Sequence, residues 1–250
     1  MNKYLNNLNR IEVVVTMACT GKCIHCQEGD HFGYNTPIDK DNILKAIKRV
    51  IDNYDIKTVM TFGGEALLYP DITCAIHTLA TISNVPKRQL ITNGYFSNDL
   101  NKIKEVASNL KQSGVNEILL SVDAFHQDTI PLEPVKYFAK CLKENNIDTY
   151  LTPSWLVSID HNNKYNIKTK EVLDKFKDLD IPTGEGNIIF ASGNALKNLR
   201  EYFGKEIDYS TPYDDDPYDI TSLSFNYNGD VLNGNINEED ILDIIDSYEP

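Results

Sequence analysis

The residues best suited to chemistry are three cysteines in one short loop. Cys19, Cys23 and Cys26 lie within eight residues, directly after the apolar run Ile11–Met17. An iron–sulfur cluster is held by cysteine thiolates, and a [4Fe–4S] cluster normally takes four of them. Three thiolates from one tight loop would hold three irons and leave the fourth iron without a protein ligand. That open iron would be a reactive position where a small molecule can bind.

Two other interpretations of the loop compete with the cluster. A disulfide framework is typical of small secreted chains, and this chain has 250 residues and begins without an apolar signal segment. We therefore expect no disulfides. A structural zinc site takes four ligands, which the three cysteines and either His25 or His31 could supply. The loop alone leaves zinc open, and segments further along the chain favour the cluster.

The apolar pattern predicts the elements that position this loop. Short runs rich in Val and Ile alternate with stretches of helical spacing, in about six β-then-α units. Such alternation implies a parallel sheet with right-handed crossovers, and six units are too few for a closed eight-stranded barrel. A doubly wound sheet would give a similar pattern. The predicted strands are Ile11–Met17, Thr58–Phe62, Gln89–Thr92, Glu117–Val122, Asp148–Trp155 and Asn187–Phe190, and the helices are Asp39–Asn53, Pro70–Thr81, Leu100–Gln112, Pro131–Asn145 and Lys168–Leu179.

Polar and glycine-rich segments follow the second, third and fourth predicted strands. Sites in barrels of this kind are built from the C-terminal strand ends, so these segments should meet the cysteine loop. Glycines there allow close backbone approach, and the two-residue period of a strand sends alternate side chains to one face. The segments are Gly63-Gly64-Glu65, Thr92-Asn93-Gly94, and Ser121-Val122-Asp123 followed by His126.

The cysteine spacing and these segments, in the same chain order, resemble the radical S-adenosylmethionine (radical SAM) superfamily. The resemblance covers roughly residues 11–200 and is most specific over the first 130. It implies an α/β fold, a partial (β/α)6 TIM-like barrel, with one [4Fe–4S] cluster on Cys19, Cys23 and Cys26. It also implies SAM at the open iron, reductively cleaved to a 5′-deoxyadenosyl radical that abstracts hydrogen from a substrate.

The same resemblance assigns roles to individual residues. His126 is a candidate proton carrier and Cys141 a candidate hydrogen-atom donor, although an orienting role for His126 and a packing role for Cys141 are the stronger expectations. An electron donor such as flavodoxin or ferredoxin is the implied partner of the cluster. The residues expected to bind SAM are His25, Gly63, Gly64, Glu65, Thr92, Asn93, Ser121, Asp123, Ser154 and Ile188.

The chain after residue 200 is predicted to differ from the core. We expect residues 1–200 to form the core and residues 201–250 an extension that closes the barrel within the same domain. Ser222–Leu232 has the pattern of a hairpin turning at Asn228-Gly229-Asp230, Glu238–Ser247 that of a closing helix, and Tyr213–Tyr218 that of a solvated acidic loop. The segment resembles the lead-in to the auxiliary-cluster (SPASM or twitch) extensions of peptide-modifying family members. No cysteine follows Cys141, so we expect no auxiliary cluster.

The composition disfavours nucleic acid and membrane as partners of this protein. The formal net charge is −13, from 24 basic and 37 acidic residues, which disfavours a broad nucleic-acid-binding face. No apolar run approaches the roughly 20 residues of a membrane helix. Free cysteines and an oxygen-sensitive type of site indicate the cytoplasm.

The substrate is open at this stage. A ribosomally made peptide is the favoured substrate, and a small metabolite is the other choice. The alternative enzyme is a glycyl-radical-enzyme activase. The alternative of another class is a non-catalytic metal-binding sensor or scaffold on the same fold.

Overall fold

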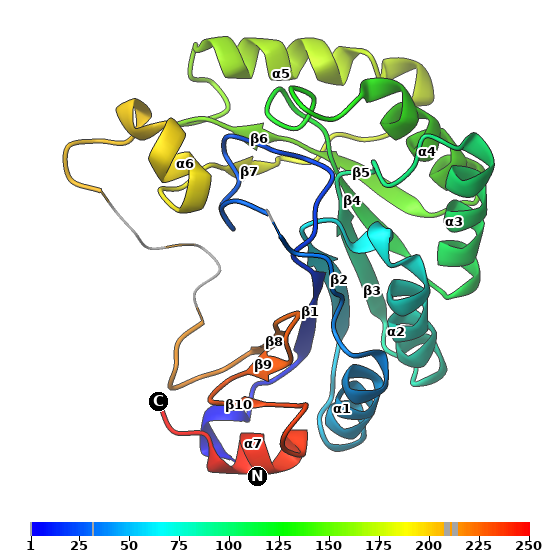
Figure 1. Ribbon diagram of the computed structural model, residues 1–250, viewed down its shortest axis with the longest axis vertical. Helices are drawn as coiled ribbons and strands as arrows, with labels where there is room; N and C mark the ends of the chain where they lie inside the picture. Colours follow the sequence, from blue (N-terminus) through cyan, green and yellow to red (C-terminus); the bar gives the residue numbers. More distant parts are fainter. Residues whose placement is uncertain (1, 32, 208–210, 212–214) are drawn as a thin grey trace.

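The computed structural model describes residues 2–31, 33–207, 211 and 215–250. Its main sheet is entirely parallel and has the strand order β5-β4-β3-β2-β1-β8. Helices cover the convex side of this curved sheet (Figure 1). The strands are β1 Arg10–Thr16, β2 Thr58–Gly63, β3 Lys87–Thr92, β4 Glu117–Ser121, β5 Asp148–Thr152, β6 Ser154–Trp155, β7 Asn187–Ile188, β8 Ser222–Phe225, β9 Asp230–Val231 and β10 Gly234–Asn235. The helices are α1 Lys40–Asn53, α2 Pro70–Ile82, α3 Leu100–Gln112, α4 Leu132–Glu144, α5 Lys164–Asp174, α6 Gly193–Asn198 and α7 Ile241–Ser247.

The architecture is the partial barrel that the sequence predicted. Each of the six predicted strands is present within two residues of its predicted bounds, although the fifth is divided into β5 and β6 at Pro153. Proline has no N–H to donate, so it interrupts the ladder there. β7 pairs in parallel with β6, and among the described strands β7 and β8 do not pair. The barrel is therefore open between those two edges (Figure 1).

Burial explains why these segments form their elements. On β1, Ile11, Val13 and Val15 are fully buried in the core beneath the helices, as expected for a strand covered on that face. Helix α1 begins after Asp39, whose side chain accepts a hydrogen bond of 2.8 Å from the Asn42 amide. Aspartate is among the residues strongly preferred at this N-cap position. Within the described residues, no helix is long and apolar enough to cross a membrane.

Helix α5 differs from its prediction. It runs over Lys164–Asp174, four residues earlier than expected at its start, and a separate 3₁₀ turn covers Lys177–Leu179. The Asn163 side chain caps α5 by accepting hydrogen bonds from the backbone amides of Tyr165 and Asn166. Asparagine is a strong N-cap residue, and this capping signal was missed because the predicted start followed apolar spacing alone.

The C-terminal segment also differs from its prediction in one respect. Ser222–Phe225 does not form a hairpin with the chain that follows, because it joins the main sheet as the parallel neighbour of β1. There it covers an edge that would otherwise expose unpaired backbone groups. The expected turn at Asn228 is present, but the antiparallel pair is β9 with β10, and α7 then packs near α1. The division into residues 1–200 and 201–250 stays a prediction.

The predicted acidic loop at 213–218 lies partly outside the described residues. In its described part, Asp215 accepts hydrogen bonds from the Thr221 hydroxyl at 3.0 Å and from the Ser222 amide at 3.2 Å. This carboxylate thus fixes the entry of β8 into the sheet.

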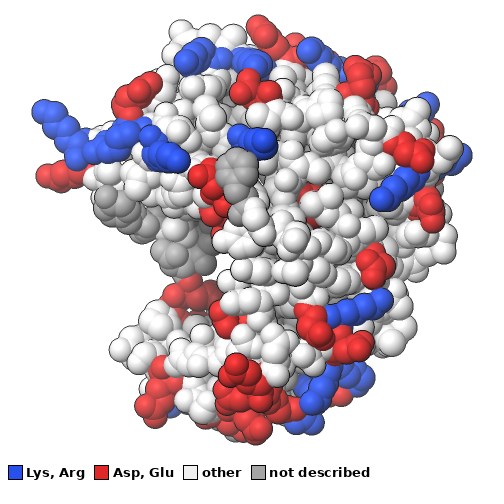
Figure 2. All heavy atoms as spheres, viewed as in Figure 1, with Lys and Arg blue, Asp and Glu red and all other residues white. Residues whose placement is uncertain are grey.

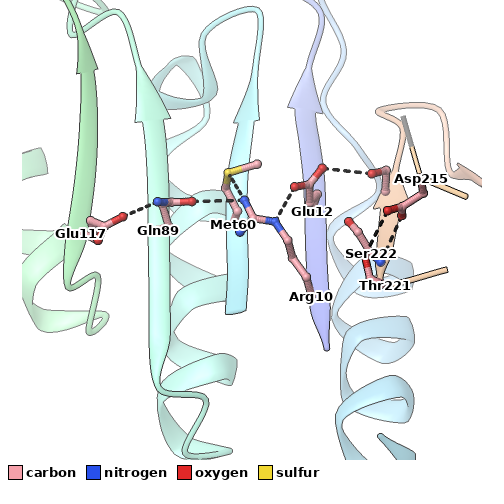
Figure 3. A network of polar contacts seen from close by, with 9 residues as sticks. Arg10, Glu12, Met60, Gln89, Glu117, Asp215, Thr221 and Ser222 are labelled. Atoms are coloured by element: carbon pink, nitrogen blue, oxygen red, sulfur yellow. Dashed lines mark hydrogen bonds and ion pairs between the residues drawn. The ribbon is translucent and has the colours of Figure 1, made fainter. Parts of the chain in front are cut away.

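A polar row crosses the concave face of the sheet (Figure 3). Ser224, Glu12, Met60, Gln89 and Glu117 are register partners on five adjacent strands. Hydrogen bonds run along the row from Ser224 to Glu12 and from Gln89 to Glu117. Arg10 joins the two halves of the row, because its guanidinium donates to Glu12 at 2.5 Å and to Gln89 at 3.2 Å.

An apolar row lies two residues further along β1 to β4 and continues onto β5, between the polar row and the C-terminal strand ends. Its side chains are all partly exposed, which leaves them facing the open interior. They are Val14, Phe62, Ile91, Leu119 and Tyr150. On the face shown in Figure 2, acidic and basic side chains are interspersed, and the surface is hollowed between α6 and the β8–β10 segment.

One buried contact makes the fold sensitive to acid. The Thr61 hydroxyl lies 2.8 Å from Nε2 of His77, and both residues are fully buried between β2 and α2. Burial lowers the pKa of His77 from 6.5 to about 3. The unfolded chain therefore binds a proton that the folded protein excludes, and stability is lost as pH falls below about 6.5.

We expect the variant His77→Gln to lose this acid sensitivity. Between pH 6 and pH 4, its free energy of unfolding should fall less steeply than that of the unaltered protein, by about 1.4 kcal/mol per pH unit. Urea denaturation at several pH values measures both slopes. Equal slopes would show that His77 is not the excluded proton site.

Candidate functional site

The three cysteines front one cavity at the C-terminal ends of the strands. The cavity has a volume of about 200 Å³, and Cys19, Cys23 and Cys26 all line it. The pKa of Cys19 is raised to about 12, mainly by burial and in smaller part by the charges of Glu65 and Cys26. Burial likewise raises the pKa of Cys23 and of Cys26. Three coupled thiols in a buried site favour a bound cation, since metal binding removes their protons.

Two glycines let the end of β2 contact the base of the cysteine loop. A Cβ atom on Gly64 would lie 2.3 Å from the Ala18 carbonyl oxygen, and one on Gly63 would lie 2.4 Å from that of Thr16. Gly63 also has φ +139°, a conformation that glycine adopts readily. The Gly64 amide donates to the Thr16 carbonyl at 2.8 Å, and the Cys19 thiol donates to the Gly64 carbonyl at 3.2 Å.

Glu65 points away from the cavity and joins the loops after β2 and β3. Its carboxylate accepts hydrogen bonds from the Thr92 hydroxyl at 2.7 Å and the Asn93 amide at 2.8 Å. Burial raises the pKa of Glu65 to about 7, although these hydrogen bonds oppose the rise. The Asn93 side chain in turn lies 3.5 Å from the Cys19 sulfur. Glu65 thus orders residues that surround Cys19.

A second segment holds the cysteine loop from its other side. The Asn194 amide donates to the Cys26 carbonyl at 2.8 Å, and the Ser192 hydroxyl donates to the Gln27 carbonyl at 3.2 Å. Gly193 permits this contact, because a Cβ there would lie 2.2 Å from the Gln27 carbonyl oxygen. The sequence did not predict this contact. The clustered small residues were the available signal.

Two histidines flank the cysteines. His31 Nδ1 donates to the Met17 carbonyl at 2.7 Å, because a carbonyl can only accept, and its Nε2 lies 3.1 Å from the Cys26 sulfur. The His25 ring packs against Phe125 with ring centroids 4.7 Å apart. The pKa of His25 is lowered to about 3, mainly by burial and in smaller part by the charge of His126. His25 is therefore neutral at physiological pH.

Most of the residues predicted to bind SAM line the cavity, and two do not. Glu65 is 1% exposed and Asp123 is 0% exposed, so both lie behind the wall. Cys141 is buried in the apolar core on α4, on the helix side of the sheet, and we leave it out of the candidate site. The predicted residues that line the cavity with the cysteines are His25, Gly63, Gly64, Thr92, Asn93, Ser121, His126, Ser154 and Ile188.

This donor set fits an iron–sulfur cluster with one open coordination position. Three thiols from one loop share the cavity, and each contributes one ligand atom. The rest of the wall offers a backbone carbonyl, hydroxyls, an amide and imidazole rings, which suit a polar organic molecule beside the cluster. Among the described residues, no fourth cysteine lines this cavity.

A family profile decides the identity. The profile of the radical SAM superfamily matches residues 13–154, which include all three cysteines and the strand ends through β5. The chain belongs to the radical SAM superfamily. It is an enzyme of that class, and it uses a [4Fe–4S] cluster and S-adenosylmethionine.

Curated relatives of this radical SAM enzyme are GTP 3′,8-cyclases. That of Desulforamulus reducens is 28% identical over 132 residues, covering 52% of this chain and 38% of the relative. The Clostridium perfringens enzyme is 28% identical over 200 residues, covering 74% and 59%. A probable GTP 3′,8-cyclase of Saccharolobus islandicus is 24% identical over 221 residues, covering 82% and 68%. The chain thus spans between 38% and 68% of the length of these relatives.

Solved structures share the fold. Streptococcus suis SuiB bound to S-adenosylmethionine has a TM-score of 0.62 at 16% identity, covering 96% of this chain and 65% of SuiB. The structure of anSMEcpe with bound AdoMet and the Cp18Cys peptide also has a TM-score of 0.62, at 12% identity, covering 95% and 80%. At these identities the likeness concerns the fold alone.

The close approach of Gly64 to the Ala18 carbonyl predicts that a side chain at position 64 would weaken cluster binding. The variant Gly64→Ala should force Ala18 and the cysteine loop apart, because its Cβ would overlap the Ala18 carbonyl. We expect the iron bound after anaerobic reconstitution to fall roughly tenfold, measured by iron assay and absorbance near 400 nm.

The matched control is Gly184→Ala, since a Cβ there would meet no heavy atom closer than 3.7 Å. Its iron content should equal that of the unaltered protein. Full iron content in Gly64→Ala would contradict the constraint.

Proposed function

We propose that this enzyme cleaves SAM reductively and uses the resulting radical to take a hydrogen atom from a small-molecule substrate in the barrel interior. The observation that carries the proposal is the sharing of one buried cavity by Cys19, Cys23 and Cys26 with the glycine-rich end of β2. When bound, the cluster and SAM supply the 5′-deoxyadenosyl radical. The protein holds both groups, orients them and excludes water.

Each wall of the cavity has a proposed role. The Gly64 carbonyl accepts a hydrogen bond from the Cys19 thiol, and it is the acceptor we assign to the ammonium group of SAM. Thr92 and Asn93 border the same end of the cavity. Ser121 and Ser154 offer hydroxyls at the ends of β4 and β6, and Ile188 with His25 gives an apolar and aromatic wall for the adenine.

The substrate is proposed to lie against the concave face of the sheet. The apolar row lies next to the C-terminal strand ends, where the radical forms, and the polar row lies deeper. A substrate with an apolar part near the SAM pocket and a polar part toward Arg10 would match both rows. The names of the curated relatives favour a small molecule over the peptide that the sequence suggested, and peptide modification stays a prediction.

The charge of the polar row argues against a polyanionic substrate. Arg10 is paired with Glu12, and Lys87 lies 2.9 Å from Glu117, so the charges balance. Triphosphates are normally bound by arginines and lysines that are free to form charge-assisted hydrogen bonds. We therefore propose a substrate other than GTP, with little net negative charge.

The location and the electron donor are also proposals. We propose a cytoplasmic location, because a reducible cluster and free thiols need a reducing compartment, and a flavodoxin or ferredoxin as electron donor. The comparisons do not favour the glycyl-radical-enzyme activase or the non-catalytic sensor.

The cysteine assignment is tested by product formation. After anaerobic reconstitution, dithionite and SAM should yield 5′-deoxyadenosine, and Cys26→Ala should abolish it because the cluster loses a ligand. Cys74→Ala is the matched control, since Cys74 lies on α2 and does not line the cavity. Liquid chromatography with mass spectrometry measures the product. Zinc binding without iron uptake, or product from Cys26→Ala, would contradict the proposal.

The substrate assignment is tested with GTP itself. We expect millimolar GTP to leave 5′-deoxyadenosine formation unchanged and to yield no cyclised nucleotide, because Arg10 and Lys87 beside the polar row are already paired with carboxylates. The Clostridium perfringens GTP 3′,8-cyclase serves as the positive control in the same assay. A GTP-dependent product would overturn the argument from charge and place this enzyme with its curated relatives.

A further inference from the structure

The turn after β4 contains a buried carboxylate whose hydrogen-bonding capacity is fully used. One oxygen of Asp123 accepts from the amides of Phe125 and His126, both at 2.9 Å. The other accepts from His126 Nδ1 at 2.8 Å and from the Ser154 amide at 2.9 Å. A carboxylate has about four lone-pair sites, so none is left for a ligand. Asp123 is also 0% exposed, and it therefore cannot touch SAM.

All four partners of Asp123 are donors, which keeps the carboxylate ionised. Burial alone would raise the pKa of Asp123, but the charge of His126 and these hydrogen bonds hold it well below its usual range. Burial would lower the pKa of His126, and the opposite charge of Asp123 outweighs it and raises that pKa. Asp123 and His126 thus form a dyad in which the carboxylate sets the state of the ring.

The dyad fixes the direction of the His126 ring. Because a carboxylate only accepts, Nδ1 of His126 carries a proton and faces Asp123, and Nε2 faces away from it. Nε2 has no hydrogen-bond partner in the described part of the chain. It is also not one of the fully buried atoms, so a ligand can reach it. His126 lines the same cavity as the three cysteines. Its free nitrogen is therefore available to a ligand in that cavity.

A metal at this position is the competing interpretation. His25, Asp123 and His126 bring three possible ligand atoms within 4.8 Å of one another. Asp123, however, has no lone pair to give, because four protein donors already occupy its oxygens. The group is better explained as a hydrogen-bond relay that ends at Nε2 of His126.

Resting on the proposed function, we propose that His126 binds a ribose hydroxyl of SAM directly through Nε2, and that Asp123 is a positioning residue that acts only through His126. His126 lines this cavity together with the three cysteines, so its side chain lies beside the space that a molecule at the open iron would occupy. The sequence predicted direct contact between Asp123 and SAM, and we assign that contact to His126 instead.

SAM affinity tests this assignment without any substrate. SAM is titrated into the anaerobically reconstituted protein in its oxidised state, and absorbance changes of the cluster report the dissociation constant. We expect His126→Phe to raise that constant about tenfold with iron content unchanged, because one polar contact is lost. His126→Gln keeps a polar group near the position of Nε2, and it should recover the affinity to within about threefold.

The matched control is His161→Phe, which alters an exposed histidine on the loop before α5 that does not line the cavity. Its dissociation constant for SAM should not change. If His126→Phe also left the constant unchanged, direct contact would be overturned. If His126→Phe lost iron, His126→Gln would decide the question, since weak SAM binding there with full iron content supports contact and normal binding refutes it.

A double-mutant comparison tests the role of Asp123. Asp123→Asn alone should weaken SAM binding by about as much as His126→Phe, and adding it to His126→Phe should cause no further loss. Additive losses would show that Asp123 acts independently and would overturn the relay. Failure of the proposed function is distinguishable, because then the unaltered protein would itself neither bind nor cleave SAM.

Discussion

The site depends on close backbone contact between the cysteine loop and glycines on both sides of it. Gly63 and Gly64 bring the end of β2 against Thr16 and Ala18, at distances that no Cβ atom could tolerate. Gly193 makes the same kind of contact with Gln27 from α6. The loop is thereby fixed between an early strand and a late helix, and its three thiols are directed into one cavity.

The rest of the fold serves this constraint. Fully buried apolar strands under the helices give a rigid parallel sheet, so the loops at its C-terminal edge keep their relative positions. Buried carboxylates then join neighbouring loops: Glu65 joins those after β2 and β3, and Asp123 joins β4 to β6. Each carboxylate accepts hydrogen bonds from protein donors, so it orders the wall of the cavity without lying in the cavity itself.

The sequence was enough to predict what is local or periodic. Cysteine spacing indicated the cluster, hydrophobic alternation indicated the strand series, and the Gly63-Gly64 pair marked the close approach. Long-range choices were beyond its reach. The contact of Asn194 with Cys26 spans most of the chain, and the pairing of β8 with β1 depends on an edge that exists only once the sheet has formed. Whether an acidic side chain faces the cavity or the protein, as for Glu65, depends on which donors surround it after folding.

The central claim is that three cysteines leave one iron of the cluster open to SAM. The most direct measurement is electron paramagnetic resonance of the reduced, reconstituted protein with and without SAM carrying ¹⁵N in its amino group. We expect SAM to change the spectrum of the cluster and pulsed methods to detect ¹⁵N coupled to it. A four-iron cluster whose spectrum is the same with and without SAM would contradict the claim.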